Sequence, residues 1–588
     1  MFKVQNSSFN GIIRRFLFLI PFSLFLVCGF AANAGQRLPA ILSDADAEVY
    51  ARIFRLQAQE RIADAQKLYG EISDQLLMSD VLYQKYMSRT YRTSGAEFAE
   101  WMRKYYNMPG AGQIHTMAQR RGANARRPVL PTSVALTGDH VANSENLTAK
   151  RYSGETGRQI NRFRSALRRG HTLNARNILE DPAFKRRVTA EDYGRLSGRL
   201  AFIYYTNGRF ELAETWAAKG AEAGSEFGLW TLGLMAFKKS DFAVAREHFS
   251  AMTKIGHLNE ARRAEAAFWA GRSAYAGGDR TAARRYWRAA SARPQTFYGA
   301  LATAMLGEVP RFEFFESHWS REDIAELMKT AHGIRALALL QIGENDRAEG
   351  HLRFLISAAS NDRLLHAVHA IAEEAGLGRT NLQVSAMIRD RDIMEISDNV
   401  ISAAQYPMPD WEPLGGWSID RALLFAVIRQ ESGFKTTARS RMGAKGVMQI
   451  MPRTARSVAR QNNKRITDMD MANPEHNMFL GQQYIVDLLS QPSIDNNIIK
   501  MLVAYNAGRG AKSNWERRFQ TDDPLLYIES FPFAETRVYV KRVLSNMWLY
   551  RARLGQPLTN ISDIAEGRWP MYESADKYVG TSRTNRAI

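Results

Sequence analysis

The chain repeats short apolar runs and polar turns in a helical rhythm from about residue 44 to about residue 400. Alanine, leucine, arginine and glutamate dominate this region, and β-branched runs of the kind that form strands are few. Apolar positions at helical spacing, with turn residues between them, are typical of consecutive amphipathic helices. The pattern therefore predicts a mainly α-helical fold.

Five turns divide the predicted helices. They are Arg169-Gly170-His171, Asn207-Gly208-Arg209, Lys239-Ser240-Asp241, Gly277-Gly278-Asp279 and Gly343-Glu344-Asn345. The first four lie roughly 32 to 38 residues apart, which is the period of tetratricopeptide-like helix-turn-helix repeats. Small residues about three positions after a turn allow two helices to approach closely. Such units bury their apolar faces only by stacking, so we expect a curved solenoid, with a plain helical bundle as the alternative.

A break follows the last predicted solenoid helix. Prolines and glycines cluster in Tyr406-Pro407-Met408-Pro409-Asp410 and in Pro413-Leu414-Gly415-Gly416. We therefore expect a solenoid over residues 35–400, with a polar loop or linker near 121–150, and a second domain over 401–565. A loose polar tail is expected over 566–588.

The first 34 residues have the features of a secretory signal peptide. Lys3, Arg14 and Arg15 precede an apolar stretch, and Ala32-Asn33-Ala34 has the small-x-small form of a cleavage site. We expect cleavage before Gly35 and export to a periplasm, since the stretch is short for a membrane anchor. No later stretch is long and apolar enough to span a membrane, so we expect no integral membrane segment after signal removal.

The net charge of +19, from 79 basic and 60 acidic residues, favours anionic partners. Export argues against nucleic acid and favours a cell-wall polymer or a membrane surface. The single cysteine, Cys28, lies inside the predicted signal, so the mature chain can form no disulfide. Val27 stands where a lipoprotein needs a small residue, which argues against lipidation.

The second domain opens with an apolar helix that ends in a carboxylate. The run Ser418-Ile419-Asp420 offers an N-cap, and one helix follows up to Glu431. Leu424, Val427 and Ile428 form an apolar face that Glu431 continues. Burial there raises the pKa of a carboxyl toward the value that a general acid needs near neutral pH. A glutamate turned to water at a frayed helix end is the alternative.

Four ordered motifs follow this helix. They are Glu431-Ser432-Gly433-Phe434 continuing through Ser440 to Gly443–Pro452, then Asn473-Pro474 with Gly481, then Ala504-Tyr505-Asn506-Ala507-Gly508, and last Phe531–Val540. In order and spacing they resemble the catalytic domain of the soluble lytic transglycosylases, the goose-lysozyme-like branch of the lysozyme superfamily. More loosely, the helices before them resemble the superhelical ring of the large soluble members, including Arg293-Pro294-Gln295-Thr296-Phe297-Tyr298-Gly299.

The resemblance implies a lyase that cleaves the β-1,4 bond between N-acetylmuramic acid and N-acetylglucosamine in peptidoglycan. Glu431 would protonate the linking oxygen and then take a proton from the C6 hydroxyl, which closes a 1,6-anhydro ring. The resemblance also implies that Glu535 binds substrate in the groove.

Other residues of the motifs have side chains suited to binding a sugar. Amides at Gln449 and Asn506 can bond acetamido and hydroxyl groups, and Tyr505 and Tyr539 offer flat faces. Ser440 could hold Glu431 or a sugar, and Met451 could form a wall. Turn shaping and core packing are the alternatives for the glycines and methionines of these motifs.

One carboxylate rather than two is consistent with this chemistry. No Asp or Glu occurs between Glu431 and Asp468, whereas ordinary glycosidases use a pair. One glutamate can serve twice when the nucleophile is part of the substrate. A muramidase of the same fold that uses water is the second hypothesis, and a periplasmic scaffold that grips glycan without cleaving it is the third.

The sequence indicates no cofactor or metal. His366 and His369 stand at helical spacing but have no further ligands beside them, so we expect packing or surface roles. No glycine-rich phosphate loop is present. The choice between endo and exo cleavage, closure of the solenoid and protein partners are left open.

Overall fold

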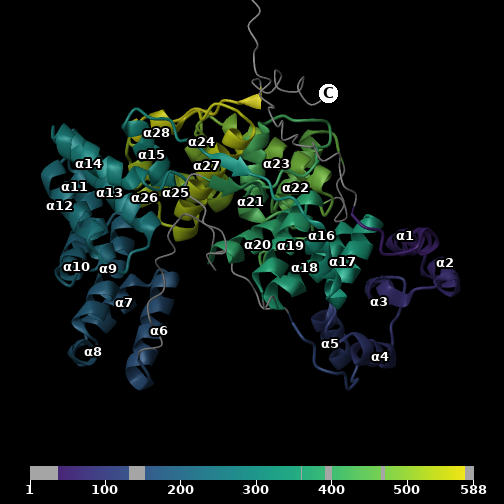
Figure 1. The fold of residues 1–588 in the computed structure, drawn as a ribbon. Helices are drawn as coiled ribbons and strands as arrows, with labels where there is room; N and C mark the ends of the chain where they lie inside the picture. The colour runs from purple at the N-terminus through teal and green to yellow at the C-terminus, as the bar shows by residue number, and fades with distance from the viewer. Residues whose placement is uncertain (1–37, 131–151, 359–360, 391–399, 465–470, 577–588) are drawn as a thin grey trace, which may run out of the picture.

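The computed structural model describes residues 38–130, 152–358, 361–390, 400–464 and 471–576, and helices make up nearly all of its regular structure (Figure 1). The strands within these ranges are β1 (Glu313–Phe315) and β2 (Val400–Ser402), which pair in parallel. The predicted mainly α-helical class is confirmed.

The first solenoid segment comprises α6 to α15. Its helices are α6 (Gly154–Arg168), α7 (Thr172–Glu180), α8 (Pro182–Arg187), α9 (Ala190–Thr206), α10 (Phe210–Glu222), α11 (Glu226–Lys238), α12 (Phe242–Thr253), α13 (Glu260–Ala276), α14 (Arg280–Ser291) and α15 (Phe297–Met305). Four of the predicted turns fall between helices of this segment, and Gly170, Gly208, Ser240 and Gly278 have positive φ there. The predicted helix-turn-helix pattern is confirmed for these turns.

Small residues lie where the helices of this segment touch. Ala213, Ala245 and Ala283, each shortly after a turn, are fully buried. A Cβ atom on Gly228 of α11 would lie 2.5 Å from the backbone nitrogen of Ala221 on α10. Because that distance is far below van der Waals contact, a larger residue at 228 would push the two helices apart.

The second solenoid segment comprises α1 to α5 together with α16 to α20. Its helices are α1 (Asp44–Ala58), α2 (Ile62–Lys67), α3 (Met78–Met87), α4 (Gly95–Tyr105), α5 (Ala111–Arg120), α16 (Arg321–Met328), α17 (Ala331–Gln341), α18 (Asn345–Ala358), α19 (Asp362–Glu374) and α20 (Gly378–Asp390). The fifth predicted turn, with Gly343 at φ 76°, separates α17 from α18.

The N-terminal helices α1 to α5 pack beside α16 to α20 and not on α6, which follows them in the sequence (Figure 1). Tyr50 and Phe54 of α1 share a core with Leu339 of α17. The side chain of Gln341 accepts hydrogen bonds from the backbone N–H groups of Ile41 and Leu42, at 2.8 and 2.9 Å. The stacking order of the helices therefore differs from their order in the sequence, because α1 finds its apolar partner about 300 residues away.

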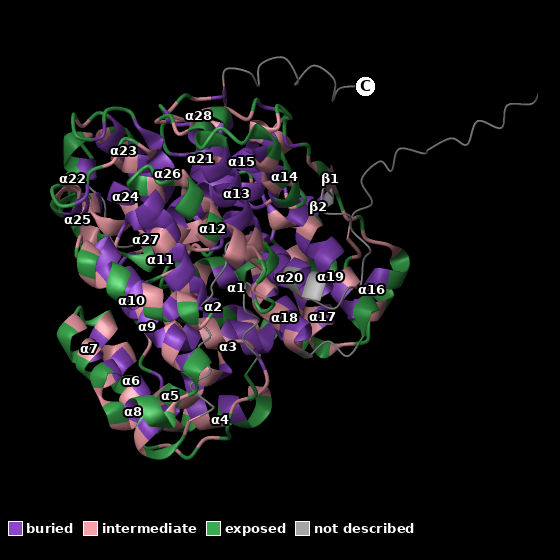
Figure 2. Ribbon diagram, turned by 90° about the vertical axis from the view of Figure 1, so that its left-hand side faces the viewer, coloured by how far each residue is buried: buried purple, intermediate pink, exposed green. Residues whose placement is uncertain are grey.

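The C-terminal helices form a compact group against the first solenoid segment. They are α21 (Arg421–Glu431), α22 (Pro452–Gln461), α23 (Pro474–Leu489), α24 (Ile498–Ala507), α25 (Arg509–Glu516), α26 (Pro524–Ser530), α27 (Ala534–Arg553) and α28 (Ile561–Glu566). One hydrophobic core runs through this group and the first segment, and Figure 2 shows largely buried residues along α21, α13 and α15.

A buried ion pair joins the start of α21 to the end of α27. Asp420 caps α21 by accepting a hydrogen bond from the Leu423 backbone N–H, as the sequence predicted. Arg551 of α27 donates from Nη2 to Asp420 Oδ2 at 2.8 Å, and both side chains are 0% exposed. Because no water reaches this pair, each charge must be compensated by the other. The pair therefore holds α21 and α27 in one register.

The expected loose tail is wrong for residues 566–576. The hydroxyl of Tyr572 accepts a hydrogen bond from the backbone N–H of Asp420 at 2.9 Å. Asp576 accepts one from the backbone N–H of Arg421 at 3.1 Å. Polar residues that satisfy the first turn of α21 explain why this hydrophilic stretch is ordered.

Some predicted segments lie outside the described residues. They are the signal peptide, residues 1–34, and the linker from residue 131 to 150. In the described part of that linker, Arg126 stacks over the ring of Tyr106 at 3.3 Å. Among the described helices, none is both long enough and apolar enough to cross a membrane.

The Asp420–Arg551 pair predicts a large effect of removing one partner. Arg551→Ala should lower the free energy of unfolding by about 3–5 kcal/mol, because the Asp420 carboxylate would be buried without a counter-charge. Arg568→Ala, which removes an exposed ion pair with Asp563, should cost less than about 1 kcal/mol. Urea denaturation of both variants measures the difference. Equal losses of unfolding free energy in the two variants would show that burial does not increase the contribution of the Asp420–Arg551 pair.

Candidate active site

Glu431 lies at the C-terminal end of α21, on the buried side of the helix. Leu424, Val427 and Ile428, which form the apolar face beneath it, are each 0% exposed. The glutamate itself is only partly buried. Gly433 follows with φ 55°, so the chain turns sharply away from the helix end. The position that the helix periodicity predicted for Glu431 is therefore the observed one.

The surroundings of Glu431 raise its pKa from 4.5 to about 8. Burial is the largest cause, because the charged form loses its hydration there. Interaction with the Tyr539 hydroxyl lowers the pKa, and the negative charge of Glu535 raises it. The effect of burial on the pKa is the largest, so the carboxyl group keeps its proton at neutral pH.

Two stacked tyrosines face Glu431. The rings of Tyr505 on α24 and Tyr539 on α27 lie 6.4 Å apart at an angle of 10°. Burial raises the pKa of both hydroxyls well above the usual value, and the Glu431 charge raises them further. The Tyr505 hydroxyl donates to the backbone carbonyl of Met448 at 2.8 Å. Tyr505 is therefore fixed by the loop that follows α21.

The Tyr539 hydroxyl is buried and makes no regular hydrogen bond in the described structure. It lies close enough to the Glu431 carboxyl to act on its pKa, but the contact does not have the geometry of a full hydrogen bond. An unsatisfied buried hydroxyl is costly. It is therefore available to bond either Glu431 or a bound ligand.

The loop between α21 and α22 is held by its own hydrogen bonds. Its backbone pairs Arg439 with Lys445 and Lys445 with Ile450. The Ser440 hydroxyl accepts from the backbone N–H of Ala444 at 3.0 Å and stabilises this turn. No described hydrogen bond joins Ser440 to Glu431, so the loop explains Ser440 without any contact to the acid.

Gln449 occupies a strained position in the same loop. Its φ is 48°, in the left-handed region that residues other than glycine seldom adopt. Its side-chain amide donates to the backbone carbonyl of Gly446 at 2.8 Å. Met451, two residues on, is 40% exposed. Strain of this kind persists where the surrounding structure imposes it, and it often marks a functional loop.

Sequence reasoning missed the residue that imposes this loop. Asn477 on α23 is fully buried; it accepts from the Met448 backbone N–H at 2.8 Å and donates to the carbonyls of Lys445 and Met471. Only its position four residues after the N-cap Asn473 was visible in the sequence. Tyr484, whose ring packs 5.5 Å from that of Tyr505, was missed too.

The remaining predicted residues lie on the far side of the site. Asn506 accepts a hydrogen bond from the Thr536 hydroxyl at 2.7 Å, which ties α24 to α27. Glu535 is exposed in the first turn of α27 and borders a cavity of about 1050 Å³ between α27 and the first solenoid segment. The structure thus gathers Glu431, Glu535, Tyr505 and Tyr539 around one point.

The two histidines that the sequence singled out lie elsewhere, in the second solenoid segment. His369 is buried and bonds Ser402 at 2.9 Å, and His366 lies 3.5 Å from Asp323. Within the ranges that the structure describes, no group of three or more His, Cys, Asp or Glu side chains could hold a metal ion.

The fold and the site define a lysozyme-like helical domain built on a solenoid, with Glu431 at its centre. Residues 413–528 match the family described as Transglycosylase SLT domain, and residues 530–558 match the Soluble lytic transglycosylase helical domain. The resemblance to the soluble lytic transglycosylases that the motifs indicated is confirmed.

Named relatives are similar to this chain over part of their length. The chain is 36% identical over 153 residues to the soluble lytic murein transglycosylase of Salmonella typhimurium and 35% identical over 156 residues to that of Escherichia coli K12. The aligned parts cover 25% and 26% of this chain and 23% and 24% of those proteins, so the likeness in sequence is confined to about a quarter of each relative.

The likeness in fold is wider. The 70 kDa soluble lytic transglycosylase of Escherichia coli superposes with a TM-score of 0.56 over 90% of this chain and 100% of that chain, at 17% identity. Lytic transglycosylase Slt of Pseudomonas aeruginosa gives a TM-score of 0.51 over 88% and 90%, at 17% identity. At such identity these matches establish a common fold, including the solenoid.

The raised pKa of Glu431 predicts a pH-dependent cost to stability. Between pH 4.5 and about 8 the side chain ionises when the protein unfolds but stays neutral when folded, so stability falls as pH rises through this range. Glu431→Gln removes the penalty. Its gain in free energy of unfolding over the parent should grow from pH 4.5 to pH 8, to on the order of 5 kcal/mol.

Thermal unfolding from pH 5 to pH 9 measures this gain. Glu222→Gln, at an exposed glutamate of α10, is the matched control and should follow the parent at every pH. A constant difference between Glu431→Gln and the parent would contradict the raised pKa.

Proposed function

We propose that the chain is a peptidoglycan lytic transglycosylase with Glu431 as acid and then base. The observation that carries the proposal is a carboxyl group whose pKa is about 8, set against stacked tyrosines in a domain of the SLT type. A glutamic acid that keeps its proton at neutral pH can donate it to a leaving group. Ordered sequence motifs and named relatives support the same reaction.

In the first step Glu431 protonates the oxygen that links N-acetylmuramic acid to N-acetylglucosamine. The glycosidic bond breaks as positive charge develops at the anomeric carbon. The carboxylate that remains then accepts the proton of the C6 hydroxyl of the same muramic acid. That oxygen bonds to the anomeric carbon and closes the 1,6-anhydro ring, so no water is consumed and Glu431 regains its proton.

The charge balance around Glu431 supports this double role. Among the described residues, Glu535 is the one acidic group that acts on the pKa of Glu431, and it does so from an exposed position. It favours the protonated form before cleavage. Because the C6 hydroxyl is part of the substrate, proximity replaces the activation of water by a second carboxylate.

The other predicted residues take binding roles in this proposal. Tyr505 and Tyr539 present ring faces and a hydroxyl beside the acid, and Asn506 and Gln449 present amides to acetamido groups. Ser440 and Met451 border the groove from the loop after α21. Glu535 binds substrate in the groove. The amides already hold hydrogen bonds within the protein, so substrate competes with these contacts.

The domain assignment and the location belong to the same proposal. Residues 35–400 form the solenoid and 401–565 the catalytic domain, and the chain acts in the periplasm after cleavage before Gly35. A net charge of +19 suits a polymer whose peptide stems carry carboxylates. Glycan strands are the partner, and neither a nucleic acid nor a cofactor is involved.

Product analysis tests the reaction. Purified sacculi digested with the chain should yield muropeptides with 1,6-anhydromuramic ends, identified by mass spectrometry. Reducing ends alone would instead support the muramidase that uses water. Glu431→Gln should lower the rate by at least about a thousandfold. Undiminished cleavage by that variant would exclude Glu431 as the catalyst.

The pH profile tests the electrostatics of the acid. With a pKa of about 8, kcat/KM should be flat near neutrality and fall as pH rises through 8, as the acid ionises. Tyr539→Phe removes an interaction that lowers the pKa, so the falling limb should move upward. Glu535→Gln removes one that raises it, so the limb should move downward. Shifts in the same direction would contradict the assigned roles.

A further inference from the structure

A buried cluster of charged groups joins α27 to the solenoid. Lys541 of α27 donates from Nζ to Glu265 Oε1 on α13 at 2.7 Å and to Glu529 Oε1 on α26 at 2.8 Å. Arg262 of α13 also pairs with Glu265, and the Tyr298 hydroxyl donates to Glu529 at 2.6 Å. All five residues are at most 7% exposed, and the two positive groups pair with the carboxylates of Glu265 and Glu529.

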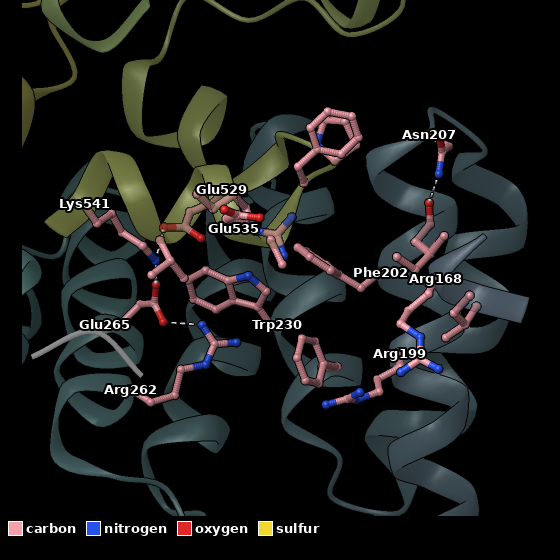
Figure 3. A pocket seen from close by; sticks show the side chains of 18 of the residues that line it. Arg168, Arg199, Phe202, Asn207, Trp230, Arg262, Glu265, Glu529, Glu535 and Lys541 are labelled. Carbon is pink, nitrogen blue, oxygen red and sulfur yellow. Dashed lines mark hydrogen bonds and ion pairs between the residues drawn. The ribbon is translucent and has the colours of Figure 1, made fainter. Parts of the chain in front are cut away.

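The cluster forms one wall of the 1050 Å³ cavity beside α27. Figure 3 shows Lys541, Glu265, Glu529 and Arg262 together on one side, with Arg168 and Arg199 on the other. Open space separates the first turns of α27 from much of the solenoid. A cavity provides no packing atoms to hold a helix, so on its solenoid side this part of α27 is held by direct contacts such as those of Lys541.

Lys541 follows Tyr539 by two residues on the same helix. Tyr539, two residues earlier, points to Glu431, and residues two apart on an α-helix point roughly 200° apart. The solenoid side and the acid side of α27 are thus nearly opposite. Arg537 of the same two turns also contacts the solenoid, with its guanidinium group 4.7 Å from the centre of the Phe202 ring.

We propose that Lys541 is a positioning residue: its ion pairs with Glu265 and Glu529 anchor α27 to the solenoid and thereby set Tyr539 against Glu431. A buried ion pair adds little stability over an apolar pair of the same shape, but it is directional. Here the direction fixes the rotation of α27 about its axis. The solenoid, through Glu265, therefore contributes to the geometry of the acid.

The groups that face Glu431 limit how this anchor can act. They are Tyr539 and Glu535 on α27 and Tyr505 on α24. Lys541 is not among the groups that act directly on the pKa of Glu431. Loss of its ion pairs must therefore affect Glu431 through a movement of α27. If Tyr539 withdraws, the interaction that lowers the pKa of Glu431 weakens.

A double-mutant cycle tests the proposal, whose kinetic readout rests on the proposed function. Lys541→Met should lower kcat/KM about tenfold and move the falling limb of the pH profile upward by roughly half a pH unit. In a Tyr539→Phe background, Lys541→Met should lower kcat/KM by less than a further factor of about two, because the interaction that it disturbs is already absent. Lys541→Arg, which keeps the charge, should restore most of the activity.

The control lies on the same helix as Glu265. Glu260→Gln removes the charge of an exposed residue of α13 that pairs with Arg293, and it should leave rate and profile unchanged. If Lys541→Met does not fold, Glu265→Gln supplies the same cycle, since it keeps the side-chain size. A crystal structure of either variant should show the Tyr539 hydroxyl displaced from Glu431.

Three results would overturn the proposal. One is a lower Tm with an unmoved pH profile, another is an equal shift in the Tyr539→Phe background, and the third is an unmoved Tyr539 in the crystal. An active Glu431→Gln variant would refute the proposed function instead. The two failures are therefore distinguishable.

Discussion

The contact between the end of α21 and the first turns of α27 is the constraint on which the site depends. At this contact the Glu431 carboxyl loses water, and that loss raises its pKa to about 8 against the opposing effect of Tyr539. The same burial leaves the Tyr539 hydroxyl without a regular partner. One desolvated point thus supplies a protonated acid and a free hydroxyl, and both would be lost if the two helices moved apart and admitted water.

Helix α27 is held in place by separate contacts at its two ends. Its C-terminal part is fixed by Arg551 to Asp420 at the start of α21, and Trp548 stacks on Phe297 of the solenoid, with ring centroids 5.6 Å apart. Its N-terminal part borders a cavity and relies on the Lys541 cluster. The first solenoid segment shares a core with the C-terminal helices, so it forms part of their support.

Much of the fold could be predicted because its signals are local. Turns such as Asn207-Gly208-Arg209 are fixed by residues that tolerate positive φ, and the apolar spacing up to Glu431 placed that residue on the buried face of one helix. The packing of α1 on α17 could not be predicted, since nothing near α1 indicates a partner some 300 residues away. The order of the polar stretch at Tyr572 and Asp576 could not be predicted for the same reason. Its partners, the backbone N–H groups at the start of α21, are distant in sequence.

The sequence by itself determined the helical class, the repeat period, the ordered motifs and the choice of Glu431 as the candidate acid, because each follows from neighbouring residues or their spacing. Only the tertiary structure decided which groups act on that acid. It placed Tyr539 and Glu535 about 100 residues further along the chain beside Glu431, gave Asn477 the task of holding the loop, and buried Glu265 against Lys541. Electrostatic effects depend on distance and burial, and those quantities exist only once the helices have packed.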